Sequence, residues 1–138
     1  MTTPQVFQGT VVSVVDGDTV KLSVRLLRTR RKNNDLGFHI YIESGWLVIH
    51  YSFRLLGCNA AERGSPGGDA ATANLITLLP VGTIVEVSSE ANDKYNRYDA
   101  NLKLPDGRDL VTLLISEQWA APWDGTGVRP VPPWPRTV

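Results

Sequence analysis

The sequence predicts a mainly β domain of the α+β class, a small barrel with attached helices and an extended Pro-rich C-terminal tail. Three observations predict it: alternating and β-branched segments fill the first half, a helical run lies in the middle, and prolines crowd the end. With 138 residues, of which 42% are apolar, the chain has the length for one domain with a buried core. The single cysteine, Cys58, excludes an internal disulfide framework and a cysteine-based zinc cluster.

The N-terminal part predicts a β-hairpin. Residues 10–15 form a β-branched run, and Asp16-Gly17 is a turn signal before a segment of strict alternation. Polar residues of that segment share one face and apolar residues share the other, as expected for a half-buried antiparallel strand. We expect the apolar set to face the core: Val20, Leu22, Val24 and Leu26.

A second hairpin is expected after a polar loop over residues 28–36. Residues 38–42 and 46–50 flank a Glu43-Ser44-Gly45 turn, and β character continues to Gly57. Residues 59–68 are rich in Gly, Ala and Ser, so we expect a loop there.

A helix is expected next, with Asp69 as its N-cap and Pro80 as its end. Residues 83–87 return to β alternation, and residues 98–104 and 108–111 flank a Pro-Asp-Gly hairpin turn. A second short helix is expected to start near Asp109 and to end before Pro122. Short strands, a central helix and closely spaced turns together predict a five-stranded OB-fold barrel.

We expect two parts in the chain, a barrel domain over residues 1–122 and a Pro/Trp-rich tail over residues 123–138. The tail cannot form a regular helix or sheet because it carries Pro130, Pro132, Pro133 and Pro135. We expect an extended segment that lies on the barrel through Trp123 and Trp134.

Charge is balanced overall, with 14 Lys and Arg against 14 Asp and Glu, so no global positive field attracts nucleic acid. Five cations nevertheless fall within eight residues: Arg25, Arg28, Arg30, Arg31 and Lys32. Two interpretations stay open, a solvated strand end with its loop and a local phosphate-facing patch. No apolar run approaches the ~18 residues of a membrane span, and nothing marks the N-terminus for secretion. We therefore expect a cytoplasmic protein without a membrane partner.

Several charged residues lie at turns and strand ends, where sites are often built. Asp16 and Asp18 flank a glycine in one tight turn, which suits either a hard cation or a purely structural hairpin. Arg54 falls in an apolar strand, where a charged side chain needs a partner. Glu62 follows eight residues later, either as a surface charge or as part of a site, and Arg97 starts a strand.

Four motifs occur in order along the chain: VVDGDTVKL at 14–22, FRLLG at 53–57, NAAE at 59–62 and DKYNR at 93–97. Together they resemble the staphylococcal nuclease-like (thermonuclease) family, over residues 10–121. The resemblance implies an OB-fold barrel and a calcium-dependent nuclease that hydrolyses phosphodiester bonds in DNA or RNA.

The resemblance also implies roles for particular residues. Asp18, Asn59 and the backbone carbonyl of Ala60 would hold Ca²⁺, with Asp16 in support. Glu62 would act as general base, while Arg54 and Arg97 would bind the phosphate and stabilise charge on its oxygens. This division suits phosphoryl transfer, which depends on positioning and charge neutralisation, and guanidinium groups suit phosphate. Further substrate contacts are expected from Arg28, Arg30, Tyr95 and Trp123, in a protein that acts as a monomer without a small-molecule cofactor.

The chain departs from the family pattern at three positions. Asn59 replaces an aspartate and Ala61 a proline, so we expect a high Ca²⁺ requirement and a less preorganised loop at Glu62. Asn96 replaces a glycine, a change that the turn tolerates. The alternative function is a catalytically weak or inactive OB-fold module that binds nucleic acid, although Arg54, Glu62 and Arg97 are all retained.

Overall fold

The computed structural model describes residues 5–32, 40–65, 67–92, 98–123, 128 and 130. Two helices and eight strands follow one another there: β1 (Gln5–Asp16), β2 (Thr19–Arg28), β3 (Ile40–Glu43), β4 (Trp46–Leu55), β5 (Cys58–Ala60), α1 (Gly68–Leu78), β6 (Ile84–Asn92), β7 (Tyr98–Lys103), α2 (Leu110–Ser116) and β8 (Ala120–Pro122). No helix in these ranges is long and apolar enough to cross a membrane.

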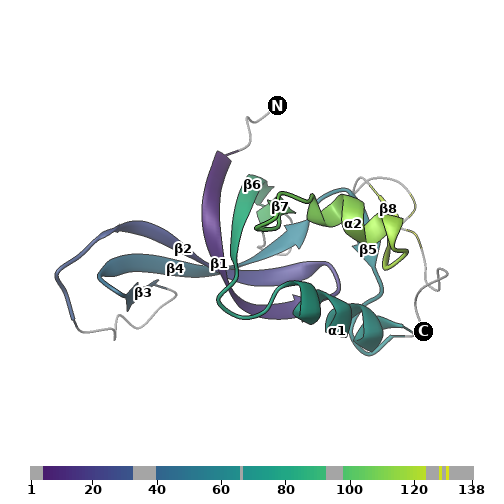
Figure 1. The fold of residues 1–138 in the computed structure, drawn as a ribbon, viewed down its shortest axis with the longest axis horizontal. Coiled ribbons are helices and arrows are strands. Elements are labelled where there is room, and N and C mark those ends of the chain that lie inside the picture. Colours follow the sequence, from purple (N-terminus) through teal and green to yellow (C-terminus); the bar gives the residue numbers. More distant parts are fainter. Residues whose placement is uncertain are drawn as a thin grey trace.

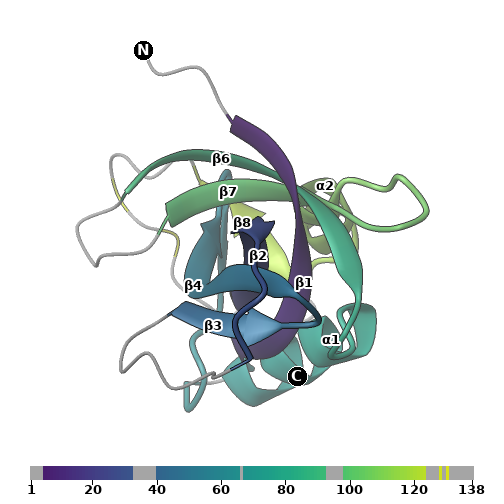
Figure 2. The ribbon, with the colours of Figure 1, turned by 90° about the vertical axis from the view of Figure 1, so that its left-hand side faces the viewer.

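Five strands close into a barrel, which confirms the predicted fold class (Figure 2). The order around the barrel is β1, β2, β4, β7 and β6, and β6 pairs with β1 to complete the circle. All of these pairings are antiparallel except that of β4 with β7, which is parallel with Phe53 opposite Tyr98. The barrel encloses a core of fully buried aliphatic side chains, among them Val20, Leu22 and Leu102.

The two ends of the molecule differ. Figure 1 shows α1, α2, β5 and β8 gathered at one end of the barrel, and a β projection at the other. That projection, here called the arm, comprises residues 25–32 and 40–50, where β3 pairs with β4 and β4 pairs with β2. Ser44 and Gly45 both have positive φ in the β3–β4 turn, as a tight two-residue hairpin requires.

Two predictions on the strands need correction. The alternation of β2 does not reach Leu26, because a register shift between Arg25 and Leu27 leaves that side chain 49% exposed. Residues 59–60 belong to β5 rather than to a loop, since Asn59 and Ala60 pair with β8. A partner strand so distant in sequence leaves no local signal at β5.

The helix ends also differ in part from expectation. The N-cap of α1 is Gly67, at φ 76°, and Asp69 lies in the first turn, where its Oδ1 accepts a hydrogen bond from Gly64 N–H (3.1 Å). Residues 108–111 form no strand; Asp109 makes only an isolated bridge with Lys103. Asp109 is instead the N-cap of α2 and accepts from Thr112 N–H, so the second helix starts where the sequence predicts.

Candidate active site

A buried ion pair joins the β1–β2 turn to β4. Register places Thr19 opposite Arg54, and Leu55 N–H donates to the Asp18 carbonyl (2.8 Å), so the two strands bring their side chains together. Arg54 Nη2 donates to Asp18 Oδ2 at 3.3 Å, and these side chains are only 12% and 6% exposed. The charged residue in the apolar strand therefore has its partner.

Asn59 joins the same group from β5. Arg54 Nη2 also donates to Asn59 Oδ1 at 3.3 Å, so one nitrogen bonds both oxygens. Ala60 N–H donates to Asp18 Oδ2 at 3.0 Å, and the Thr19 hydroxyl donates to Asp18 Oδ1 at 3.1 Å. Three separate segments thus converge on one carboxylate.

Glycines permit this convergence. Gly57 has φ 87° in the turn from β4 to β5, a conformation that brings Asn59 back toward Arg54 and that favours glycine. At Gly17 a Cβ would lie 2.9 Å from the Cβ of Ala60 and 3.0 Å from that of Ala71. The Asp-Gly-Asp turn is therefore packed against β5 and α1, which fixes the direction of Asp18.

Asp16 stands beside this group and is half-buried. Its Oδ1 accepts hydrogen bonds from the backbone N–H groups of Gly17 (2.7 Å) and Arg63 (3.2 Å). Burial raises the pKa of Asp16, and the negative charges of Asp18 and Glu62 raise it further, against the lowering by the hydrogen bonds. The carboxylates of Asp18 and Glu62 therefore both act on Asp16 at this end of the barrel.

Glu62 lies in the loop after β5 and its side chain is exposed. Its carbonyl accepts from both the N–H (2.9 Å) and the hydroxyl (2.6 Å) of Ser65, which forms a tight turn. The same carbonyl lies so close to Gly68 that a Cβ on that glycine would collide with it. The backbone of Glu62 is thus held against the first turn of α1.

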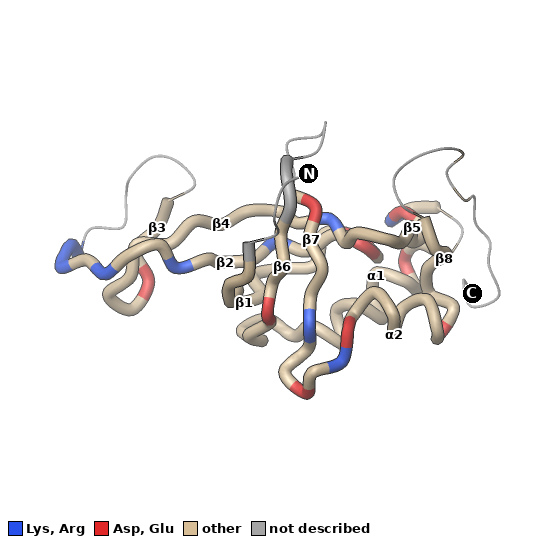
Figure 3. The backbone as a smooth tube through the Cα atoms, turned by 90° about the horizontal axis from the view of Figure 1, so that it is seen from above, with Lys and Arg blue, Asp and Glu red and all other residues tan. Residues whose placement is uncertain are grey.

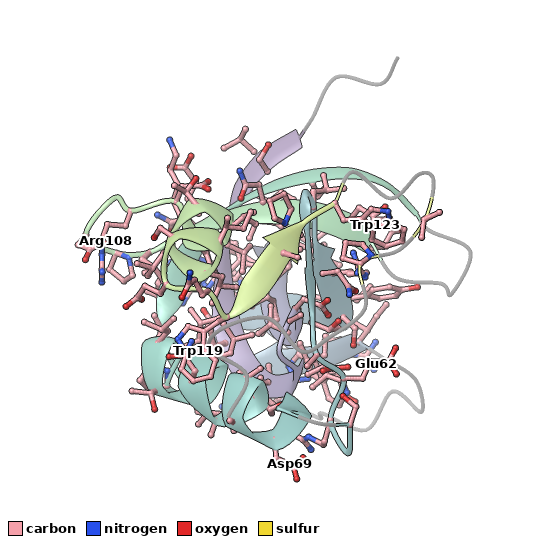
Figure 4. The ribbon with its side chains drawn as sticks, turned by 90° about the vertical axis from the view of Figure 1, so that its right-hand side faces the viewer. Glu62, Asp69, Arg108, Trp119 and Trp123 are labelled. Atoms are coloured by element: carbon pink, nitrogen blue, oxygen red, sulfur yellow. The ribbon has the colours of Figure 1, made fainter. Side chains whose placement is uncertain are left out.

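Trp123 covers the guanidinium of Arg54. Its ring centroid is 5.6 Å from Arg54 Cζ, and its backbone N–H donates to the Gly57 carbonyl at 3.0 Å. Figure 4 shows Trp123 and Glu62 on one side of the molecule and Arg108 on the other. Trp123 therefore contacts the barrel over Arg54, whereas the expected contact through Trp134 lies outside the described residues.

The structure does not unite all the predicted site residues. Arg28 is the last residue of β2 and Arg30 follows it, so both lie on the arm. Arg54 pairs with Thr19, at the other end of β2. Arg97 and Tyr95 lie outside the described residues, as does Trp134. A further contact was not predicted: Asn59 Nδ2 donates to the Pro130 carbonyl at 3.0 Å. No pattern around Pro130 signals it, whereas the Thr19 hydroxyl could have been inferred from its place beside Asp18.

Oxygen donors dominate this group. The common hydrogen bonds to Arg54 Nη2 show that Asp18 Oδ2 and Asn59 Oδ1 face one point, where a positive group now lies. Carboxylate and amide oxygens are what Ca²⁺ prefers, so the residues present fit a hard cation in kind. Among the described residues, however, no three His, Cys, Asp or Glu side chains form a metal-binding group. One carboxylate and one amide make a weak site.

Cys58 supplies no nucleophile to the site. It is fully buried in β5, and burial raises the pKa of its thiol to about 12. A thiol with such a pKa stays protonated at neutral pH, and the thiolate is the reactive form.

No known protein-family model matches the chain, and no characterised protein shows significant sequence similarity to it.

Proposed function

We propose that the protein is a calcium-dependent nuclease that hydrolyses phosphodiester bonds in DNA or RNA. The observation that supports this most is the convergence of Asp18, Arg54 and Asn59, with Glu62 held a few residues further on. The order of these residues in the chain is also that of the nuclease-like motifs. We propose further that the enzyme is monomeric and acts in the cytoplasm.

In this proposal Arg54 binds the scissile phosphate. A guanidinium has five N–H donors, and Arg54 uses three in hydrogen bonds to the described residues. The others would bind a phosphate oxygen, and the pairing with Asp18 holds the group in place. Arg97 would supply a second guanidinium to the same phosphate.

Glu62 would accept a proton from the attacking water. Its side chain is exposed, so water reaches it, while the Ser65 hydrogen bonds and Gly68 fix its backbone. A positioned general base contributes about 10²–10⁴-fold to a rate. Asp18, Asn59 and the Ala60 carbonyl would hold Ca²⁺, which when bound neutralises charge on the phosphate. Because Asn59 is neutral, we expect weak binding and a high Ca²⁺ requirement.

The alternative function is an OB-fold module that binds nucleic acid without cutting it. The engagement of Arg54 with Asp18 and Asn59 favours this alternative, because the two side-chain oxygens proposed to hold Ca²⁺ are already hydrogen-bonded to a guanidinium nitrogen. Ala61 adds to it, since the loop before Glu62 lacks the stiffness of a proline.

Cleavage of single-stranded DNA by the purified protein, followed over a Ca²⁺ titration, tests the proposal. We expect cleavage that rises with Ca²⁺, disappears in EDTA and falls about 10²-fold or more in Glu62→Gln. Glu117→Gln, another exposed carboxylate at the end of α2, is the matched control and should cleave normally. If Glu62→Gln turns over as fast as the parent, Glu62 is not the base. A folded protein without cleavage at high Ca²⁺ would favour the binding module.

A further inference from the structure

One face of the sheet continues from Arg54 to the tip of the arm. In an antiparallel pair, opposed residues lie on the same face, and every second residue along a strand shares it. The opposed pairs on the face of Arg54 are Thr19 with Arg54, Lys21 with Ser52, Ser23 with His50, Arg25 with Val48, and Arg28 with Trp46. Eight residues separate Arg54 from Trp46, a span of about 27 Å at about 3.4 Å per residue.

Cations are held in place at the far end of this face. The guanidinium carbons of Arg25 and Arg28 lie 5.0 Å and 4.7 Å from the ring centroid of Trp46. Both arginines are exposed, so the ring orients them without removing them from solvent. The register shift after Arg25 contributes to this arrangement, because it lets Arg28 as well as Arg25 reach the same ring.

The chain beyond β2 adds to the positive charge. Arg30, Arg31 and Lys32 are all exposed. Their backbone is anchored, since Thr29 N–H donates to the Gly45 carbonyl (3.0 Å) and Arg31 N–H donates to the Thr29 hydroxyl (3.1 Å). Figure 3 shows this concentration of blue at the end of the arm, away from the barrel.

Little negative charge opposes these cations. Within the described part of the arm the only carboxylate is Glu43. Glu43 accepts from the Ser23 hydroxyl at 2.8 Å and lies 2.7 Å from His50 Nε2, on which Tyr41 stacks at 4.2 Å. Because Ser23 and His50 are an opposed pair on the face of Arg54, Glu43 lies on this face, between Arg54 and the arginines. Ser23 and Val48 are buried there, so the positive charge of the face is concentrated at its two ends, at Arg54 and at the tip of the arm.

We propose that this face binds the phosphate backbone of the nucleic-acid strand whose scissile phosphate Arg54 holds. This inference rests on the proposed function and names the form of its substrate, a strand that extends over the arm. A span of ~27 Å corresponds to about eight nucleotides at the ~3.4 Å axial rise of a duplex strand, and to fewer nucleotides of an extended single strand. Short substrates therefore miss the arm, and long ones gain affinity from it.

Binding of fluorescein-labelled single-stranded DNA to the Glu62→Gln protein, in buffer with Ca²⁺, tests the arm separately from cleavage. The probes are an oligonucleotide of about 20 nucleotides and a dinucleotide, which reaches the site but not the arm. The double variant Arg25→Gln/Arg28→Gln should bind the long probe about tenfold more weakly. Arg108→Gln replaces an exposed arginine on the other side of the molecule from Trp123 and Glu62, and it should bind the probe as the parent does.

Two further measurements make the result decisive. The slope of log affinity against log salt should fall by about 1.4 in the double variant, because each phosphate contact to a single strand contributes about 0.7. The preference for the long probe over the short one should shrink by the same tenfold factor. A second pair, Arg30→Gln/Arg31→Gln, should also weaken long-probe binding, and it leaves the contacts with Trp46 intact.

Equal binding of the long probe by the parent and both double variants overturns the inference about the arm. Failure of the proposed function has a different signature, namely wild-type cleavage by the Glu62→Gln protein or no Ca²⁺-dependent cleavage at all. Weaker binding in both double variants, with an unchanged salt slope, also overturns it, because the loss then does not come from phosphate contacts.

Discussion

Two arginine–aspartate pairs lie in contrasting parts of the molecule. Arg54 and Asp18 meet at 3.3 Å at the candidate site, with side chains 12% and 6% exposed. Arg108 and Asp106 meet at 2.7 Å in the turn after β7, with side chains 55% and 54% exposed. The shorter contact is therefore the one in water.

The comparison shows that burial, not distance, decides what each pair does. Water and salt screen the exposed pair, and both of its side chains lose conformational freedom when they meet. The buried pair lies in a medium of lower dielectric constant, and removing one partner leaves the other charge uncompensated. Asp18 would still accept from Ala60 and Thr19, but neither donor carries a full charge.

Alanine substitution at each arginine gives the largest contrast. Arg54→Ala should lower the free energy of unfolding by about 3 kcal/mol, because the Asp18 carboxylate stays buried without its cation. Arg108→Ala should unfold at the same urea concentration as the parent. Urea denaturation followed by circular dichroism measures both, and cleavage should be lost only in Arg54→Ala.

A third variant sharpens this test. Arg54→Ala/Asp18→Asn removes the stranded charge, so it should recover part of the stability that Arg54→Ala loses. If the two single alanine variants are equally destabilised, or if the double variant recovers nothing, the Arg54–Asp18 charge pair does not contribute as proposed.

Gly68→Ala should have the next largest effect. An alanine inside a helix normally stabilises relative to glycine by about 0.5–1 kcal/mol. At Gly68 the added Cβ would collide with the Glu62 carbonyl, so the loop must move. We expect a loss of about 1–3 kcal/mol in unfolding free energy and slower cleavage, measured by urea denaturation and by initial rates.

Ala73→Gly, at an exposed position of the same helix, is the control for this change. It should cost about 1 kcal/mol through ordinary helix propensity and should leave the cleavage rate unaltered. A stabilised Gly68→Ala protein would show that the loop of Glu62 does not depend on its contact with α1.

Local signals in the sequence predicted most of the barrel. The Asp-Gly turn, the Ser-Gly turn and the Asp109 cap each specify structure through residues within a few positions, and all three occur where expected. The prediction that Asp69 is the N-cap was wrong, because Gly67, in the left-handed conformation, takes the N-cap position of α1 instead. The pairing of β5 with β8 was not predicted, because no local signal at β5 shows which distant segment supplies its partner strand.

The candidate site was predictable in the same uneven way. A lone arginine in an apolar strand requires a partner, so the sequence predicted that Arg54 is paired. It did not predict that Asp18 is the partner, because that depends on the register of β2 against β4. The contact of Asn59 with the Pro130 carbonyl was not predicted either, because a backbone acceptor is present at every residue and carries no side-chain signature.

Asp16→Asn should have the smallest effect, and its sign is the informative part. The pKa of Asp16 is raised in the folded protein, chiefly by burial, so ionising it costs more there than in the unfolded chain. Its contribution to stability is therefore full below the ordinary pKa of 3.8 and is lost as pH rises through the higher folded value. Asparagine does not ionise and can still accept from Gly17 and Arg63.

Asp16→Asn should thus be more stable than the parent near pH 7 and equal to it near pH 3. Asp106→Asn is the opposite case, because the hydrogen bond from the backbone N–H of Arg108, which Arg108→Ala retains, is the main cause that lowers the pKa of Asp106. The Asp106 carboxylate contributes to folding stability above its ordinary pKa and loses that contribution as pH falls. Asp106→Asn should therefore be slightly less stable than the parent near pH 7. Urea denaturation over this pH range measures both differences. If both variants change the free energy of unfolding near pH 7 in the same direction, burial does not set the pKa of Asp16. The contrast between the buried and the exposed region would then not hold for these two carboxylates.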